Sequence, residues 1–197
     1  MITGLPESTK YILASRSPRR QQLLREAGID FTVRYHDHDE TYPPGLNGRE
    51  IAEYLSAAKA EMFREDGLKD NEIVITADTI VWCNGKVLDK PSDGQEALEI
   101  IRTISGNSHD VITGVTLLSS KKEVTFSETT LVYFSWLSDD EIRFYIDKYK
   151  PFDKAGAYGI QEWIGIVGNS RIEGSYFNVM GLPVQRLIAE LRKFSAT

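Results

Sequence analysis

The chain has 197 residues, of which 41% are hydrophobic and 26% charged, with a formal net charge of −6. This length is enough for a substantial core and predicts one domain over residues 1–197, and the composition is that of a soluble globular protein. The acidic balance argues against a broad surface for a nucleic acid polymer, and no apolar stretch approaches the length of a membrane span. A local basic pocket for a small anion is compatible with this acidic net charge.

The N-terminal segment "MITGLPESTK" lacks the basic region and apolar core of a secretion signal, which predicts a cytoplasmic protein. Cys83 is the single cysteine and sits in "TIVWCNG". We expect it to be a half-buried strand residue rather than a nucleophile.

The first predicted unit is a strand followed by a helix, in "YILASRSPRRQQLLREAGI". Ser17 is a candidate cap, Pro18 suits a first helical position and Gly28 suits the end of the helix. Free N–H groups at such a helix start favour anions, and Arg19 and Arg20 add positive charge. The alternative is that Ser17 only caps a helix whose arginines face water.

Further along, "FTVRY" predicts extended structure and residues 47–67 predict a helix with Asn47 as cap. "EIVITADTIVW" predicts a strand, and the pair Asn84-Gly85 predicts a hairpin. Another capped helix is expected in residues 92–106, and paired strands are expected in 109–120 and 123–136. Helices should follow in 138–149 and after Pro183. These alternating elements predict an α/β fold around a mixed sheet.

Several charged side chains stand where chemistry could use them. Asp78 lies in a predicted strand and needs a partner, either a structural arginine or backbone cap, or a divalent metal or a water to be activated. Lys90 precedes Pro91 in "VLDKPSD" and is a candidate only if it converges with Asp78 and with the first motif, "YILASRSPRR". Glu40 is a candidate to share a divalent cation, Mg²⁺ or Mn²⁺, with Asp78.

Two further segments leave alternatives open. "HDHDE" places His36 and His38 on the same side of an extended strand as Glu40, but a solvated edge is a better interpretation than a zinc site. "FDKAGAYGIQ" carries small residues that either form a tight packed turn or let backbone approach a ligand. Gln161 at its end offers the donor and acceptor that base recognition requires.

Together, "LASRSPRRQQLL", "ADTIVWCNGKVLDKPSD", "SHDVITGV", "DKAGAYGIQ" and "GSYFNVMGLPV" resemble, in this order, the Maf family of nucleoside triphosphate pyrophosphatases. "AGAYGIQ" resembles the subgroup acting on dTTP and UTP. The chain departs from the family's pattern at "YKPF", where many members have Gly-Glu-Pro, and at "EW" after Gln161, where a glycine is common.

The resemblance implies a two-lobed mixed sheet with flanking helices and a central cleft, as in inosine triphosphate pyrophosphatases. It also implies hydrolysis to a nucleoside monophosphate and pyrophosphate with a divalent metal cation. Asp78 corresponds to the family's proposed proton acceptor, with Lys59 and Lys90 as further catalytic residues and Glu40 as a metal ligand beside Asp78. The substrate-binding positions it implies are Ser15, Ser17, Arg19, Arg20, Thr79 and Gln161.

Two other functions compete with this one. The first is a nucleotide-binding regulatory protein with negligible turnover, and the second is the same chemistry on a modified purine triphosphate. A homodimer is expected by family analogy alone.

Overall fold

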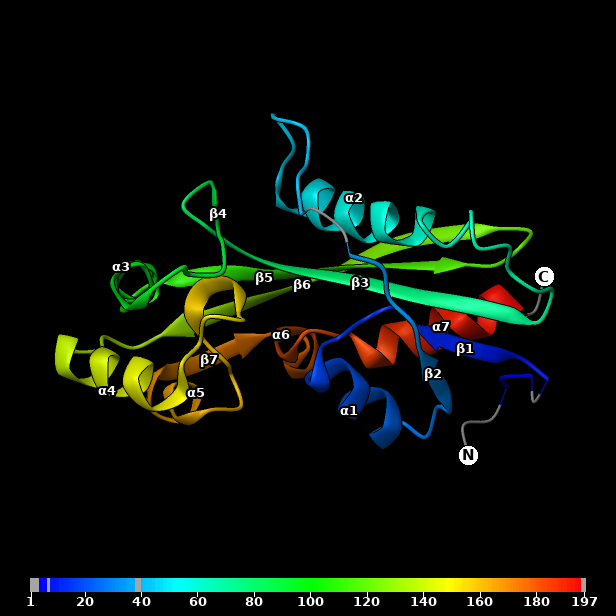
Figure 1. Ribbon diagram of the computed structural model, residues 1–197. Coiled ribbons are helices and arrows are strands. Elements are labelled where there is room, and N and C mark those ends of the chain that lie inside the picture. Colours follow the sequence, from blue (N-terminus) through cyan, green and yellow to red (C-terminus); the bar gives the residue numbers. More distant parts are fainter. Residues whose placement is uncertain (1–3, 7, 38–39, 196–197) are drawn as a thin grey trace. The chain divides into compact units, whose positions relative to one another are not determined.

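A computed structural model describes residues 4–6, 8–37 and 40–195. Its strands form a seven-stranded sheet in the order β2-β1-β3-β5-β6-β7, with β4 paired to β3 (Figure 1). The strands are β1 (Lys10–Leu13), β2 (Phe31–Val33), β3 (Glu72–Cys83), β4 (Lys86–Leu88), β5 (Ser108–Leu118), β6 (Glu123–Phe134) and β7 (Asn169–Glu173). The predicted α/β fold around a sheet is thus confirmed.

The strand pairings make the sheet mixed. β1 pairs in parallel with β2 and β3, whereas β4 is antiparallel to β3 and β7 is antiparallel to β6. The β3–β4 hairpin turns at Asn84 and Gly85, whose φ angles are 52° and 78°. Two successive left-handed residues match the right-handed twist of the strands, which is why Asn-Gly predicted this turn correctly.

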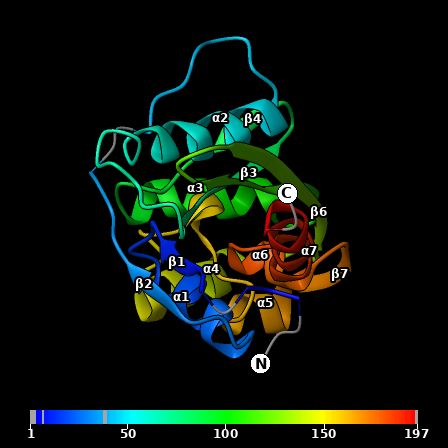
Figure 2. The same cartoon turned by 90° about the vertical axis from the view of Figure 1, so that its right-hand side faces the viewer.

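The chain divides into two compact units, the first comprising Met1–Asp78, Thr113–Glu128 and Gly181–Thr197 and the second Thr79–Ile112 and Thr129–Met180. In the first unit, helix α2 (Gly48–Glu61) covers one face of the sheet and α1 (Pro18–Glu26) and α7 (Val184–Ser195) cover the other (Figures 1 and 2). Asn47 caps α2 through a reciprocal bond with Glu50, as its sequence predicts.

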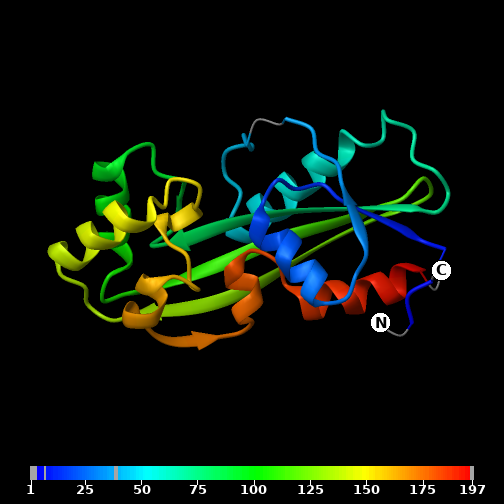
Figure 3. The ribbon, with the colours of Figure 1, turned by 60° about the horizontal axis from the view of Figure 1, so that its bottom comes forward.

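The second unit has its own core. Helices α3 (Gly94–Ile104) and α4 (Asp139–Tyr149) pack together, and the short turn η1 (Ala155–Ala157) contacts α3 and β4 (Figure 3). Buried side chains from these elements, from β5 and from β6 form one hydrophobic cluster. The presence of two such units agrees with the expectation of two lobes.

Three short elements were not expected from the sequence. They are α5 (Trp163–Gly168), β7 and α6 (Tyr176–Met180). Each has at most six residues, which is too short for a periodic pattern to stand out, so their formation depends on tertiary packing. None of the helices in the described ranges has both the length and the hydropathy of a membrane-spanning segment.

Candidate active site

The start of α1 is built as its sequence predicts. Ser17 is the cap and its Oγ accepts a hydrogen bond from the backbone N–H of Arg20 at 3.4 Å, while Pro18 opens the helix. The backbone N–H of Ser17 in turn donates to Oγ of the buried Ser15 at 3.1 Å. Both serines therefore shape the turn between β1 and α1, where helix N–H groups favour an anion.

Arg20 is anchored to backbone. Its Nε donates to the carbonyl of Gly181 at 2.8 Å and its Nη1 to the carbonyl of Ala77 at 2.7 Å. Burial lowers the pKa of Arg20, and the negative charges of Asp78 and Glu40 act in the opposite direction. A guanidinium fixed in this way supplies positive charge beside Asp78 and holds together three separate stretches of the first unit.

Asp78, Lys59 and Glu40 form the centre of the site. The Nζ of Lys59 contacts Oδ1 of Asp78 and lies 3.1 Å from Oε1 of Glu40. The Asp78 side chain is 9% exposed, that of Lys59 19% and that of Glu40 44%. Asp78 therefore has a partner, as an aspartate inside a strand needs: the ammonium of Lys59 contacts it, and Arg20 adds positive charge nearby.

The position of Lys59 depends on how α2 lies on the sheet. One turn before Lys59, the carbonyl of Ser56 accepts a hydrogen bond from Oγ1 of Thr76 at 2.6 Å, and Oγ of Ser56 pairs with Oγ1 of Thr116 at 3.1 Å. A Cβ at Gly114 would lie 2.0 Å from the carbonyl oxygen of Ala52, so only glycine permits this approach of β5 to α2. These contacts fix the register that brings Lys59 to Asp78.

The two carboxylates suit a divalent cation. Their oxygens meet at a single ammonium, and Mg²⁺ is commonly held by one or two carboxylates together with substrate phosphates. Within the described ranges, no three His, Cys, Asp or Glu side chains gather as a cluster that would hold a metal by itself. The donor set therefore fits a cation that is shared with a phosphate ligand.

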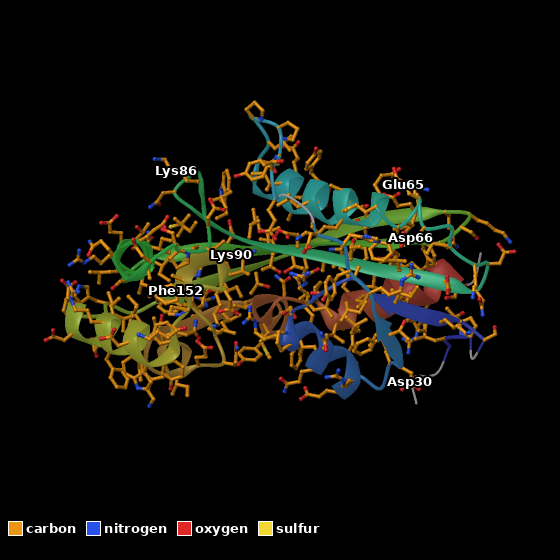
Figure 4. All side chains as sticks on the ribbon, in the orientation of Figure 1. Asp30, Glu65, Asp66, Lys86, Lys90 and Phe152 are labelled. Carbon is orange, nitrogen blue, oxygen red and sulfur yellow. The ribbon has the colours of Figure 1, made fainter. Side chains whose placement is uncertain are left out.

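The remaining predicted site residues belong to the second unit. Thr79 is half-buried and follows Asp78 in β3, whereas Lys90 and Gln161 are exposed. Figure 4 shows Lys90 on the segment after β4. The structure thus brings together Ser15, Ser17, Arg19, Arg20, Glu40, Lys59 and Asp78 within the first unit, and places Thr79, Lys90 and Gln161 in the second.

The segment before Gln161 is packed tightly. Gly156 and Ala157 have φ angles of 70° and 56°. A Cβ at Gly156 would lie 2.7 Å from Cγ2 of Val81, and the hydroxyl of Tyr158 is 2.7 Å from Nε2 of the buried His109. Gly156 therefore serves the packed turn, which was one of the two interpretations of this motif.

His36 and Cys83 have contacts that fit a structural role. His36 lies 3.0 Å from Oδ2 of Asp66, which also pairs with Arg34, as expected for a charged edge, whereas His38 lies outside the described residues. Cys83 is a buried residue at the end of β3, and burial together with the nearby charge of Asp110 raises the pKa of its thiol. A thiol of this kind is a poor nucleophile.

Sequence reasoning missed the polar residues that support the site. Ser56, Thr76 and Thr116 are fully buried yet carry the contacts that position α2. The only signal available was a hydroxyl side chain within an otherwise apolar pattern. Glu162 directly follows Gln161, where the chain departs from the family's pattern, and no feature of the sequence indicates a role for it.

Comparisons with known proteins show which family this chain resembles. The family model described as "Maf-like protein" matches residues 10–194. A protein of Bacteroides thetaiotaomicron named "dTTP/UTP pyrophosphatase" is 51% identical over 98% of this chain and 100% of its own length. One of Parabacteroides distasonis with the same name is 50% identical over 94% of this chain and 96% of its own.

Among solved structures, the Ham1 protein of Staphylococcus aureus aligns with a TM-score of 0.43 and 16% identity, over 64% of this chain and 72% of that one. The match to the family model spans nearly the whole chain and includes every candidate residue described above. This chain therefore belongs to the Maf family.

Proposed function

We propose that this protein hydrolyses dTTP and UTP between the α and β phosphates, releasing the nucleoside monophosphate and pyrophosphate. The observation that carries the proposal is the whole-length similarity to proteins named dTTP/UTP pyrophosphatase, at 51% and 50% identity. The paired carboxylates and the cationic helix start give this similarity a chemical basis. We treat residues 1–197 as one functional domain.

The triphosphate would bind where the first unit gathers its cations. Backbone N–H groups at the start of α1 favour phosphate oxygens, with Ser15 and Ser17 shaping that turn. Arg20 is committed to the carbonyls of Ala77 and Gly181, and Arg19 points about 100° away from it around the helix. We therefore assign the direct phosphate contact to Arg19 and a supporting charge to Arg20.

The bond-breaking step requires activation of water and stabilisation of the departing pyrophosphate. In the proposal, Asp78 accepts the proton of the attacking water, and Lys59 holds the Asp78 carboxylate in place and balances its charge. Lys90 supplies further positive charge. Glu40 and Asp78 would hold a Mg²⁺ or Mn²⁺ ion, which neutralises charge on phosphate oxygens when bound.

We assign recognition of the base to Gln161. Uracil and thymine present the same pattern of two carbonyl acceptors around one N–H donor, whereas cytosine has an amino group in place of one carbonyl. The carboxamide of Gln161 has both a donor and an acceptor and can match that pattern. Thr79 is assigned to the same task.

The test is pyrophosphate release from a panel of nucleoside triphosphates with Mg²⁺ or Mn²⁺, followed by identification of the nucleotide product. Monophosphate formed fastest from dTTP and UTP is the expected result. Preference for a modified purine triphosphate would overturn the proposed substrate, and tight binding without release would indicate a regulatory protein instead. Cytoplasmic location, a homodimer and the absence of nucleic acid or membrane partners stay predictions of the sequence.

A further inference from the structure

Glu162 turns inward directly after the exposed Gln161. Its side chain is 18% exposed, and its Oε1 lies 3.3 Å from Nζ of Lys154. Its Oε2 accepts a hydrogen bond from the hydroxyl of Tyr145 in α4. One carboxylate therefore joins the start of the segment 154–162 to its end, and both to a helix of the same unit.

The partners of Glu162 are themselves held firmly. The Lys154 side chain is 9% exposed and its Nζ also lies 2.7 Å from Oδ1 of Asp153. Tyr145 is fully buried, and its oxygen accepts a hydrogen bond from the backbone N–H of Gly159 at 3.0 Å. Burial and the Glu162 carboxylate raise the pKa of Tyr145, so its hydroxyl stays a donor to Glu162 at neutral pH.

The same carboxylate covers the backbone just before Gln161. A Cβ at Gly159 would lie 2.8 Å from Cδ of Glu162, and the backbone N–H of Glu162 donates to the carbonyl of Gly159 at 3.0 Å. Gln161 thus lies within the turn 159–162, which the backbone of Glu162 closes by a hydrogen bond and the side chain of Glu162 covers. Figure 4 labels Phe152 near the start of this segment, and Figure 3 shows the segment between α4 and α5.

We propose that Glu162 is a positioning residue for Gln161 and that, through Lys154 and Tyr145, it sets the base selectivity of the enzyme. The inference rests on the proposed function. An exposed glutamine must give up rotamer freedom to bind a base, so its discrimination depends on how rigidly its backbone is held. The Glu162 network supplies that rigidity from inside the unit.

The test variant is Glu162→Gln, which keeps the size of the side chain but places an amide N–H₂ against either the Lys154 ammonium or the Tyr145 hydroxyl proton. The ratio of kcat/KM for UTP to that for CTP should fall about tenfold, near the lower end of what a hydrogen bond to a charged group contributes. The loss should appear mainly in KM for UTP. The double variant Lys154→Gln, Glu162→Gln restores a donor–acceptor pair and should recover much of the ratio.

A second comparison separates positioning from general stability. If Glu162 acts through Gln161, adding Glu162→Gln to a Gln161→Ala protein should leave the UTP to CTP ratio unchanged. The matched control is Glu173→Gln, because Glu173 also pairs with a cation and a tyrosine hydroxyl, Arg171 at 2.9 Å and Tyr133 at 3.0 Å, at an exposed position. The Glu173→Gln control should have the same UTP to CTP ratio as the unmodified protein.

If Glu162→Gln lowers kcat/KM equally for UTP and CTP, or leaves both values unchanged, the ratio stays the same. Either result would overturn the inference while leaving the proposed function intact. The affinity ratio for the non-hydrolysable α,β-methylene analogues of UTP and CTP, measured by calorimetry, reads the same selectivity without turnover. A protein that binds these analogues with a ratio sensitive to Glu162 but hydrolyses no nucleotide would overturn the proposed function and support the inference.

Discussion

Replacing Lys59 with methionine removes an ammonium from between two carboxylates while keeping a side chain of similar length. Breaking a buried ion pair by removing one partner costs about 3–5 kcal/mol. The Asp78 side chain is 9% exposed and that of Lys59 19%, so water reaches the pair partly and we expect the lower end, about 3 kcal/mol. In a chain of this size each 1 kcal/mol shifts Tm by about 2–4 °C, so Tm should fall by about 6–12 °C.

The measurement is thermal unfolding at pH 7, with Lys121→Met as the matched control. Lys121 lies 3.5 Å from Asp70, but both side chains are more than 70% exposed, at 75% and 77%. An exposed pair contributes about 0–1 kcal/mol, so the control should lose at most about 4 °C. A Lys59→Met protein as stable as the control would refute the argument that Asp78 requires this counter-ion.

The same variant tests the metal assignment. Without the ammonium, Glu40 and Asp78 repel each other more strongly, so Mg²⁺ should raise the Tm of Lys59→Met more than that of the unmodified protein. Adding Glu40→Gln should abolish the extra response. An equal response to Mg²⁺ in all three proteins would remove the basis for assigning the cation to these carboxylates.

Three further outcomes follow from the described geometry. Asp78→Asn should lower kcat for dTTP by about 10²-fold or more with an unchanged circular dichroism spectrum, and near-normal pyrophosphate release would reject its role as proton acceptor. Gly114→Ala places a Cβ 2.0 Å from the carbonyl oxygen of Ala52 and should cost about 1–3 kcal/mol in urea unfolding; no loss would show that α2 is not held there. Burial lowers the pKa of His109 from 6.5 to about 4, so the unfolded chain binds this proton first as pH falls. The contribution of His109 is present above pH 6.5 and is lost at up to about 1.4 kcal/mol per pH unit down to about pH 4, a dependence that His109→Gln should remove.

Local chemistry made parts of the fold predictable. The cap at Asn47, the helix start at Pro18 and the turn at Asn84-Gly85 each depend on residues within a few positions, and all three form as expected. Short-range signals of this kind act before tertiary packing is considered.

The sequence indicates which residues are candidates for the centre of the site, but not which of them are in contact. Asp78 contacts Lys59, 19 positions earlier, because buried hydroxyls and Gly114 fix the register of α2 on the sheet. No periodic pattern encodes that register. The role of Glu162 was also hidden, because its two partners come from a helix and from the other end of its own turn.

The anchoring of Arg20 has a consequence for biosynthesis. Its bonds reach Ala77 and Gly181, which lie 57 and 161 positions away in sequence. The first unit combines the beginning, a middle stretch and the end of the chain. During translation this unit therefore cannot be completed until the residues around Gly181 have left the ribosome, and we expect this long-range closure to be slow compared with local helix formation. A protein truncated before Gly181 should thus be inactive, although it contains Asp78, Lys59 and Gln161.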